Sequence, residues 1–237
     1  MMKAMTYKKN KRGKQNRSAT QNEYGSIMIY ILIAVGLLAA LSFAVSQSGR
    51  GSGGTVGAER QRLLATEILE YGEIISNTVA QLRLRGVPVN QLSFARPEDA
   101  GFDDQPEAEI FNPAGGAAIY QPPPREAVNI IGQDYLFLAG NQVPGAGTTC
   151  VTADCADLVL AIPNVSEAVC LQINRLLSIG GAPPDTPMDL DHLFSPGANP
   201  FTAPVSMAVP TGQREGCVNN TTPTPSIFVY YKLLLAR

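Results

Sequence analysis

The hydrophobic and polar positions divide the chain of 237 residues into a basic start, one long apolar run and a mixed remainder. The apolar run covers residues 27–45 and contains no charged side chain. A helix of its 19 residues would be roughly 28 Å long, which is close to the hydrocarbon thickness of a bilayer. The pattern therefore predicts a transmembrane helix over residues 26–47, in contact with membrane lipid.

Residues 58–85 have apolar or nearly apolar side chains at alternating spacings of four and three, which is typical of an amphipathic helix. The stripe consists of Leu64, Ile68, Tyr71, Ile75, Thr78 and Leu82. Leu63, Ile74 and Val79 widen it, as expected for a helix that packs on a sheet. Between this helix and the apolar run, residues 48–57 are rich in glycine, a poor helix former, and we expect a flexible hinge there.

The rest of the chain alternates short apolar runs with proline and glycine, which favours strands joined by long loops. We expect strands at residues 117–120, 129–131, 135–139, 158–162 and 227–235. The last run is apolar at both alternating sets of positions, so it should lie in the middle of a sheet or be covered on both faces. The predicted fold class is α+β, with the amphipathic helix packed on a small, mainly antiparallel sheet in a domain of residues 58–237.

A second, shorter helix is expected after the strand at residues 158–162. Asn164 can cap its first turn, Glu167 completes a capping box, and Gly180 with Gly181 ends it. Its buried face should comprise Val165, Val169, Ile173, Leu176 and Leu177.

Charge is distributed unevenly along the chain. The first 25 residues carry seven basic side chains and one acidic side chain, giving +6, whereas the remainder has 11 basic and 19 acidic residues, giving −8. Positive charge beside an apolar span favours a cytoplasmic N-terminus. We therefore expect residues 1–25 to be cytoplasmic and the acidic domain to be exported.

All four cysteines, Cys150, Cys155, Cys170 and Cys217, fall within the part of the chain that we expect to be exported. An even number of cysteines in an exported domain is typical of disulfides. Zinc would need closer spacing or a neighbouring histidine. Of the three possible pairings, we favour Cys150 with Cys155 and Cys170 with Cys217.

The apolar run has three possible fates: a permanent anchor, a cleaved secretory signal, or a retained helix behind a short leader. Ser42 and Ala44 are small residues placed correctly for cleavage before Val45, although the run is longer than a usual signal sequence. In the third case, the leader would be residues 1–25.

A basic leader that ends in Gly25, followed directly by Ser26 and the apolar run, resembles the N-terminus of type IV pilins and pseudopilins. The resemblance covers residues 1 to about 85. It implies that a dedicated peptidase cuts between Gly25 and Ser26, and that the apolar helix stays in the bacterial inner membrane. The chain departs from the family at Tyr30, where a glutamate that helps to register filament subunits usually stands. The glycine-rich linker is a second departure, because pilins commonly have one unbroken helix.

No catalytic, cofactor or metal site is predicted. The carboxylates Asp99, Asp103, Asp104, Glu107 and Glu109 do not have the spacing of a calcium-binding loop, and we interpret them as solvated loop residues. Asp185, Asp189, Asp191 and His192 include the only histidine of the chain, and we predict no zinc site there because a second histidine is absent. The basic stretch beside the apolar run is better explained by membrane topology than by nucleic-acid binding.

Two functions follow from this sequence, and neither is enzymatic. The first is a pilin-like structural subunit, anchored in the inner membrane, that displays a disulfide-stabilised domain in the periplasm or outside the cell. Its partners would be other pilin-like subunits or an export machine. The alternative is a single-pass, membrane-anchored periplasmic binding module.

Overall fold

The computed structural model describes the backbone of residues 23–147 and 154–237. Side chains are described for residues 27–43, 57–147 and 154–237. The chain divides into two compact units, Met1–Thr55 and Val56–Arg237, and each is described by itself. We expected a membrane-spanning helix over residues 26–47; within the described residues, no helix is both long enough and apolar enough to cross a membrane.

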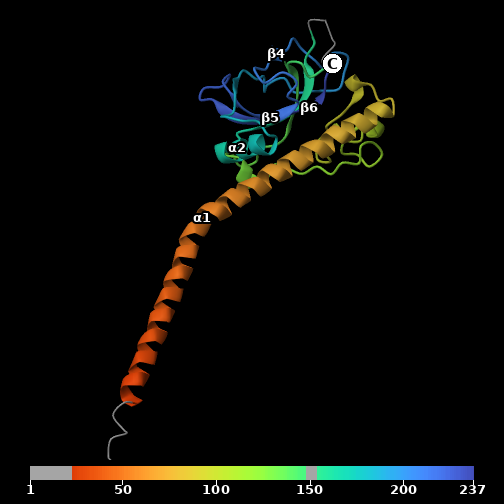
Figure 1. Ribbon diagram of the computed structural model, residues 1–237. Helices are drawn as coiled ribbons and strands as arrows, with labels where there is room; N and C mark the ends of the chain where they lie inside the picture. The colour runs from red at the N-terminus through yellow and green to blue at the C-terminus, as the bar shows by residue number, and fades with distance from the viewer. Residues whose placement is uncertain (1–22, 148–153) are drawn as a thin grey trace, which may run out of the picture. The chain divides into compact units, whose positions relative to one another are not determined.

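The first helix, α1, comprises Glu23–Leu84 and includes the glycine-rich residues 48–57 (Figure 1). The expectation that this segment would not form a helix is therefore wrong, whereas its role as a flexible hinge stays a prediction. Helix propagation is cooperative, so the strong helix formers that begin at Ala58 extend the helix although each glycine costs about 1 kcal/mol relative to alanine. The boundary between the two compact units nevertheless lies in this segment, between Thr55 and Val56.

The predicted apolar stripe of the amphipathic helix is confirmed. Its buried or partly buried members are Leu64, Ile68, Tyr71, Ile75, Thr78 and Leu82. Val79 is also buried, but Leu63 and Ile74 are 69% and 52% exposed. The prediction of burial is wrong for these two residues because they lie eleven positions apart, about three helical turns, on a face that points away from the core.

The second unit contains one six-stranded sheet with the order β3-β5-β6-β2-β1-β4. The strands are β1 Leu136–Gln142, β2 Asp157–Pro163, β3 Asp185–Thr186, β4 Val205–Ser206, β5 Glu215–Asn220 and β6 Ile227–Leu235. The four longer strands pair antiparallel, whereas β3 and β4 pair parallel with their neighbours at the edges. The α+β class and the mainly antiparallel sheet are thus as predicted.

Both faces of the sheet are covered. One face carries the second half of α1 and the helix α2, Glu167–Leu176, and includes Leu160 and Tyr230 in a common core. The other face is covered by loops that bring Met188 and Met207 against Tyr231. Alternate residues of β6 therefore enter different cores, which confirms that this strand is central and explains why it is apolar throughout.

The helix α1 approaches β6 closely at Gly72. A Cβ atom at this position would overlap the hydroxyl of Tyr230. One residue later, Glu73 accepts a hydrogen bond from Lys232 Nζ at 2.8 Å, and Glu215 accepts another from the same nitrogen at 3.0 Å. The Lys232 side chain is only 8% exposed, so the two carboxylates compensate its charge where water has little access.

The segment between α1 and β1 is irregular and contains three short 3-10 helices, Val89–Gln91, Pro106–Ala108 and Arg125–Ala127. The strands predicted at residues 117–120 and 129–131 do not form. Ala117 has a φ of 55°, which lies outside the β region that a strand needs, and residues 129–131 form a bend and a turn. The strands predicted at 135–139, 158–162 and 227–235 correspond to β1, β2 and β6.

The start of α2 differs from the expected capping box. Ser166 is the N-cap residue, without a side-chain capping hydrogen bond. Asn164 has a φ of 60°, and its amide donates to Gln133 Oε1 at 3.0 Å. The polar side chain is therefore used in a left-handed turn at the end of β2, where asparagine is tolerated. The apolar face of α2 is buried at Val169 and Ile173, as predicted.

The disulfide between Cys170 and Cys217 is present and joins α2 to β5. It confirms one of the two predicted pairs. Cys155 is buried immediately before β2, but Cys150 lies outside the described residues, and the pairing of these two cysteines stays a prediction.

Candidate functional site

The first half of α1 has an unusual surface. All side chains of residues 27–43 are exposed, and the large apolar ones range from 53% exposure at Ile33 to 70% at Leu32. Contiguous exposed apolar surface usually marks a site of contact with a membrane or another protein. This segment is therefore the first candidate site.

The residues of the predicted leader cleavage lie at the start of the same helix. Gly25 and Ser26 belong to the first turn of α1, and Tyr30 lies one turn further on with a side chain that is 69% exposed. Tyr30 is thus an aromatic residue on the helix surface.

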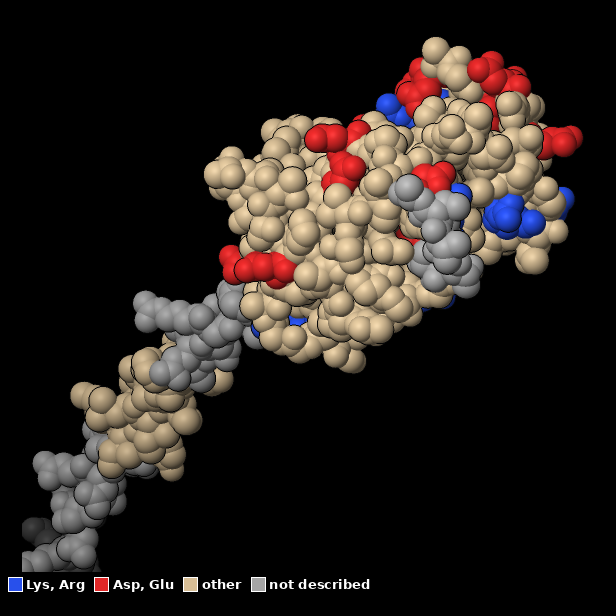
Figure 2. Space-filling view, turned by 90° about the horizontal axis from the view of Figure 1, so that it is seen from above, with Lys and Arg blue, Asp and Glu red and all other residues tan. Residues whose placement is uncertain are grey.

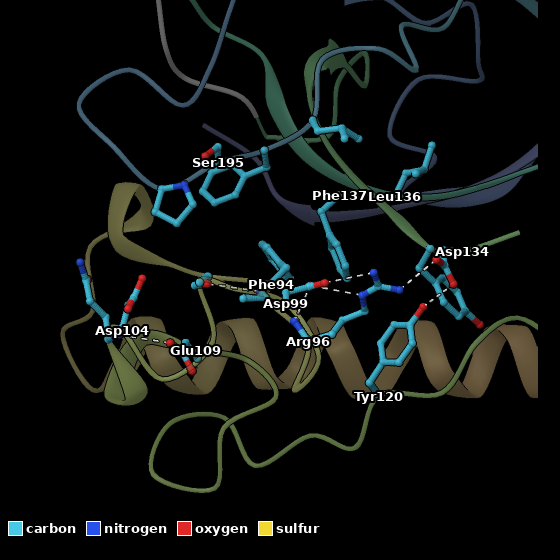
Figure 3. Close-up of a pocket in the computed structure, with 18 of the residues that line it drawn as sticks. Phe94, Arg96, Asp99, Asp104, Glu109, Tyr120, Asp134, Leu136, Phe137 and Ser195 are labelled. Atoms are coloured by element: carbon cyan, nitrogen blue, oxygen red, sulfur yellow. Dashed lines mark hydrogen bonds and ion pairs between the residues drawn. The ribbon is translucent and has the colours of Figure 1, made fainter. Parts of the chain in front are cut away.

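The second candidate site is a pocket of about 570 Å³ in the second unit (Figure 3). It lies among residues 91–109, residues 134–137 at the start of β1, and the loop 193–196. Its aromatic wall contains Phe94 and Phe137, whose rings stack with centroids 3.9 Å apart. Phe194 meets Phe94 edge-on at 5.7 Å.

The polar wall of the pocket is organised by Arg96. Its guanidinium donates to both oxygens of Asp99, at 3.2 and 3.1 Å, and to Asp134 at 2.9 Å. The hydroxyl of Tyr120 donates to the other oxygen of Asp134 at 2.8 Å. The guanidinium carbon also lies 5.4 Å from the centroid of the Tyr120 ring. A single cation thus joins loop residues that are far apart in the sequence (Figure 3).

These contacts shift the ionisation of the network. Hydrogen bonds from the Arg96 side chain and backbone hold the pKa of Asp99 below its usual value. The bond to Asp99, followed by the contact with Tyr120, raises the pKa of Arg96. Burial, together with the hydrogen bond to Asp134, raises the pKa of Tyr120. At neutral pH the network therefore holds the Arg96 guanidinium beside the Asp99 carboxylate, together with a neutral Tyr120 phenol.

The predicted acidic loop residues have different environments. Glu109 is fully buried and accepts hydrogen bonds from the backbone of Asp103 and Gln105 and from the amide of Asn112, at 3.0 to 3.2 Å. For Glu109 the interpretation as a solvated carboxylate is wrong, because it organises the loop from inside. Asp103, Asp104 and Glu107 are exposed, as expected.

The carboxylates near His192 also have local structural roles. Asp189 accepts hydrogen bonds from the backbone N–H groups of Asp191 and His192 at 2.9 and 3.2 Å. Asp185 accepts one from the Asn219 amide at 2.8 Å. In the part of the chain that the structure describes, no three His, Cys, Asp or Glu side chains are grouped so as to hold a metal ion.

The sequence did not single out Arg96, Tyr120 or Asp134. The three-residue spacing of Arg96 and Asp99 is a weak local signal for an ion pair. Asp134 is 38 positions from Arg96, and no periodicity connects them. Comparison of the chain with known protein families, with curated proteins and with solved structures finds no match.

Proposed function

We propose that this protein is a pilin-like structural subunit, anchored in the bacterial inner membrane, that displays a disulfide-stabilised domain in the periplasm or outside the cell. The observation that carries the proposal is the division of α1. Residues 27–43 expose apolar side chains, whereas the later residues of the same helix bury a stripe against a sheet.

The continuity of α1 supports this proposal. A glycine-rich break is one of the two departures from the pilin pattern in the sequence, but the backbone is helical from Glu23 to Leu84. The second departure from the pilin pattern, Tyr30 in place of a glutamate, is unaffected by the structure. A pilin-like subunit without the glutamate would be registered in an assembly by other contacts, which favours a minor or atypical role among other subunits or in an export machine.

The membrane location is inferred from the sequence. The uncharged stretch continues to Gly49, beyond the residues whose side chains are described. The +6 charge of the first 25 residues favours a cytoplasmic N-terminus, and a single span after it would place the remainder outside the cytoplasm. The disulfide Cys170–Cys217 is consistent with an oxidising compartment.

The leader distinguishes this function from a plain anchor. We expect the membrane-extracted protein to begin at Ser26, with the apolar helix retained. Intact mass and N-terminal sequencing measure this directly. A protein that begins at Val45 would indicate a secreted domain, and an uncut chain would indicate a permanent anchor; either result would contradict the pilin-like assignment.

A matched pair of variants sharpens the test. Gly25→Leu should leave the precursor uncut, because the peptidase of the resembled family requires the glycine, whereas Ser26→Ala should be processed normally. The domain of both variants should still fold, since its core lies in residues 56–237. Equal processing of the two variants would contradict cleavage at this site.

The pocket around Arg96 favours a second candidate function, a membrane-anchored periplasmic binding module. A concave site that combines apolar rings with a few convergent polar groups is typical of ligand binding. This function does not depend on leader cleavage or on assembly. Measured binding of a ligand to a protein whose N-terminus is uncut would favour it over the pilin-like function.

A further inference from the structure

The pocket combines a hydrophobic wall with a negatively charged one. Phe94, Phe137 and Phe194 form the first wall, and Leu193, which is 55% exposed, lies at its rim. Small-molecule and side-chain pockets typically have volumes of about 300 to 1,000 Å³, and this one falls in that range. It can therefore hold a group with an apolar body.

The charges of the lining are unbalanced. Three carboxylates of the lining, those of Asp99, Asp104 and Asp134, share one basic side chain, Arg96. Glu109 also borders the pocket, but it is fully buried and hydrogen-bonded within its own loop. Arg96 pairs with Asp99 and Asp134, and among the described residues Asp104 forms no salt bridge with a basic side chain. A concave site lined mostly by one sign of charge focuses the electric field and raises the local concentration of cations.

The second unit is acidic on the face that Figure 2 shows, where acidic side chains outnumber basic ones. The negative lining would repel an anionic ligand. A neutral ligand would not neutralise the excess negative charge of the lining. A ligand with an alkyl stem and a cationic end would use both walls, because aromatic rings also attract cations.

We propose that the pocket binds a guanidinium or ammonium group carried on an alkyl stem, such as an arginine or lysine side chain of an extended peptide. The stem would lie along Phe94 and Phe194, and the charged end would point toward Asp104 and Asp99. The inference rests on the second candidate function, for which it names the ligand class, and is independent of the pilin-like function.

Binding to the full-length protein in detergent micelles tests this inference. The probe is an end-blocked glycine-arginine-glycine peptide, and the control is the same peptide with citrulline, which has nearly the same shape without the charge. We expect the citrulline peptide to bind about tenfold more weakly by titration calorimetry. Agmatine, a free guanidinium compound, serves to separate a small-molecule ligand from a peptide; binding of either compound supports the proposal.

Two matched variants locate the effect. Asp104→Asn should weaken binding of the arginine peptide by about threefold, because it removes one charge from an exposed lining position. Glu107→Gln removes a charge from the same loop outside this pocket and should leave the affinity unchanged. Both residues are exposed, and an unchanged unfolding transition will show that both variants are folded.

The proposal is wrong if the arginine and citrulline peptides bind equally, since the site would then select neutral hydrogen-bonding groups. It is also wrong if neither the arginine peptide nor agmatine binds to folded protein. Equal losses of peptide affinity in Asp104→Asn and Glu107→Gln would also contradict the proposal. Binding would then depend on the overall negative charge of the surface and not on the pocket. None of these outcomes depends on where the mature N-terminus lies, so the test is separate from that of the pilin-like function.

Discussion

The two halves of α1 use apolar residues in opposite ways. Residues 27–43 are apolar on every side and exposed throughout, whereas residues 58–84 place apolar side chains on one stripe and charged ones elsewhere. Ile33 and Ile68 illustrate the contrast, with exposures of 53% and 0%. The periodicity of apolar residues thus indicates packing within the chain, and uniform apolarity indicates contact with something outside it.

The largest expected effect comes from truncating the buried stripe. Ile68→Ala should lower the free energy of unfolding by about 3 to 5 kcal/mol, because it leaves a cavity in the core. Ile33→Ala makes the same chemical change at an exposed position and should have almost no effect. Urea denaturation followed by tyrosine fluorescence measures both. Similar losses in the two variants would mean that the two halves of the helix do not differ in this way.

A charge in the first half tests its proposed membrane contact. Leu37→Lys should weaken partitioning into lipid vesicles by about 3 kcal/mol, the cost of a charged side chain near the centre of a membrane helix. The unfolding of the second unit should not change. Leu37→Ala is the control and should partition nearly as well as the unaltered chain. Unchanged vesicle co-sedimentation of Leu37→Lys would argue against insertion of this segment.

Removing the ion pair between α1 and β6 should have a smaller effect. Glu73→Gln should cost about 1 kcal/mol at neutral pH, because Lys232 keeps Glu215 as a partner. The exposed Glu70 makes no ion pair among the described residues, so Glu70→Gln is the matched control. Equal stability of the two variants would show that the contact with Lys232 does not stabilise the fold.

This ion pair also predicts a pH dependence. The hydrogen bond and charge of Lys232 lower the pKa of Glu73 from its usual value of 4.5. Its stabilisation is therefore fully present above about pH 4.5 and is lost as the pH falls through the lowered pKa of the folded state. The difference in unfolding free energy between the unaltered chain and Glu73→Gln should shrink over that range.

The smallest effect is expected at the exposed apolar positions of the second half. Leu63→Ser and Ile74→Ser should each change the free energy of unfolding by less than about 0.5 kcal/mol, because neither side chain is in the core. Thermal denaturation of the two single variants measures this change in stability. A loss comparable to that of Ile68→Ala would place these residues in an interface that forms in solution.

Much of the fold could be predicted because its signals are local. The stripe containing Ile68 and Ile75 has helical spacing, and β6 is apolar throughout. The strand predicted at residues 117–120 does not form because Ala117 has a left-handed backbone conformation, which the sequence does not reveal for an alanine. The helix in the glycine-rich segment was not predicted because the helix propensity of its glycines was considered without the strong helix formers that follow them.

The candidate sites differ in the same respect. The exposed half of α1 could be recognised from composition alone. The pocket could not, because Arg96, Tyr120 and Asp134 have no common periodicity and are brought together only when the loop before β1 folds onto α1 and the sheet. A buried carboxylate such as Glu109 also looks in the sequence like its exposed neighbours Asp103 and Asp104.

The absence of a side chain at Gly72 restricts how α1 can be rotated about its axis. Successive residues of a helix are turned by about 100° around its axis, so rotation by one residue would bring the side chain of Tyr71 or Glu73 against the Tyr230 hydroxyl. A broad apolar stripe would allow α1 to pack on the sheet in several slightly different rotations. Contact between Gly72 and the Tyr230 hydroxyl is possible in only one of these rotations. Gly72 therefore fixes the rotation of α1 about its own axis. That rotation in turn determines that Leu63 and Ile74 face solvent.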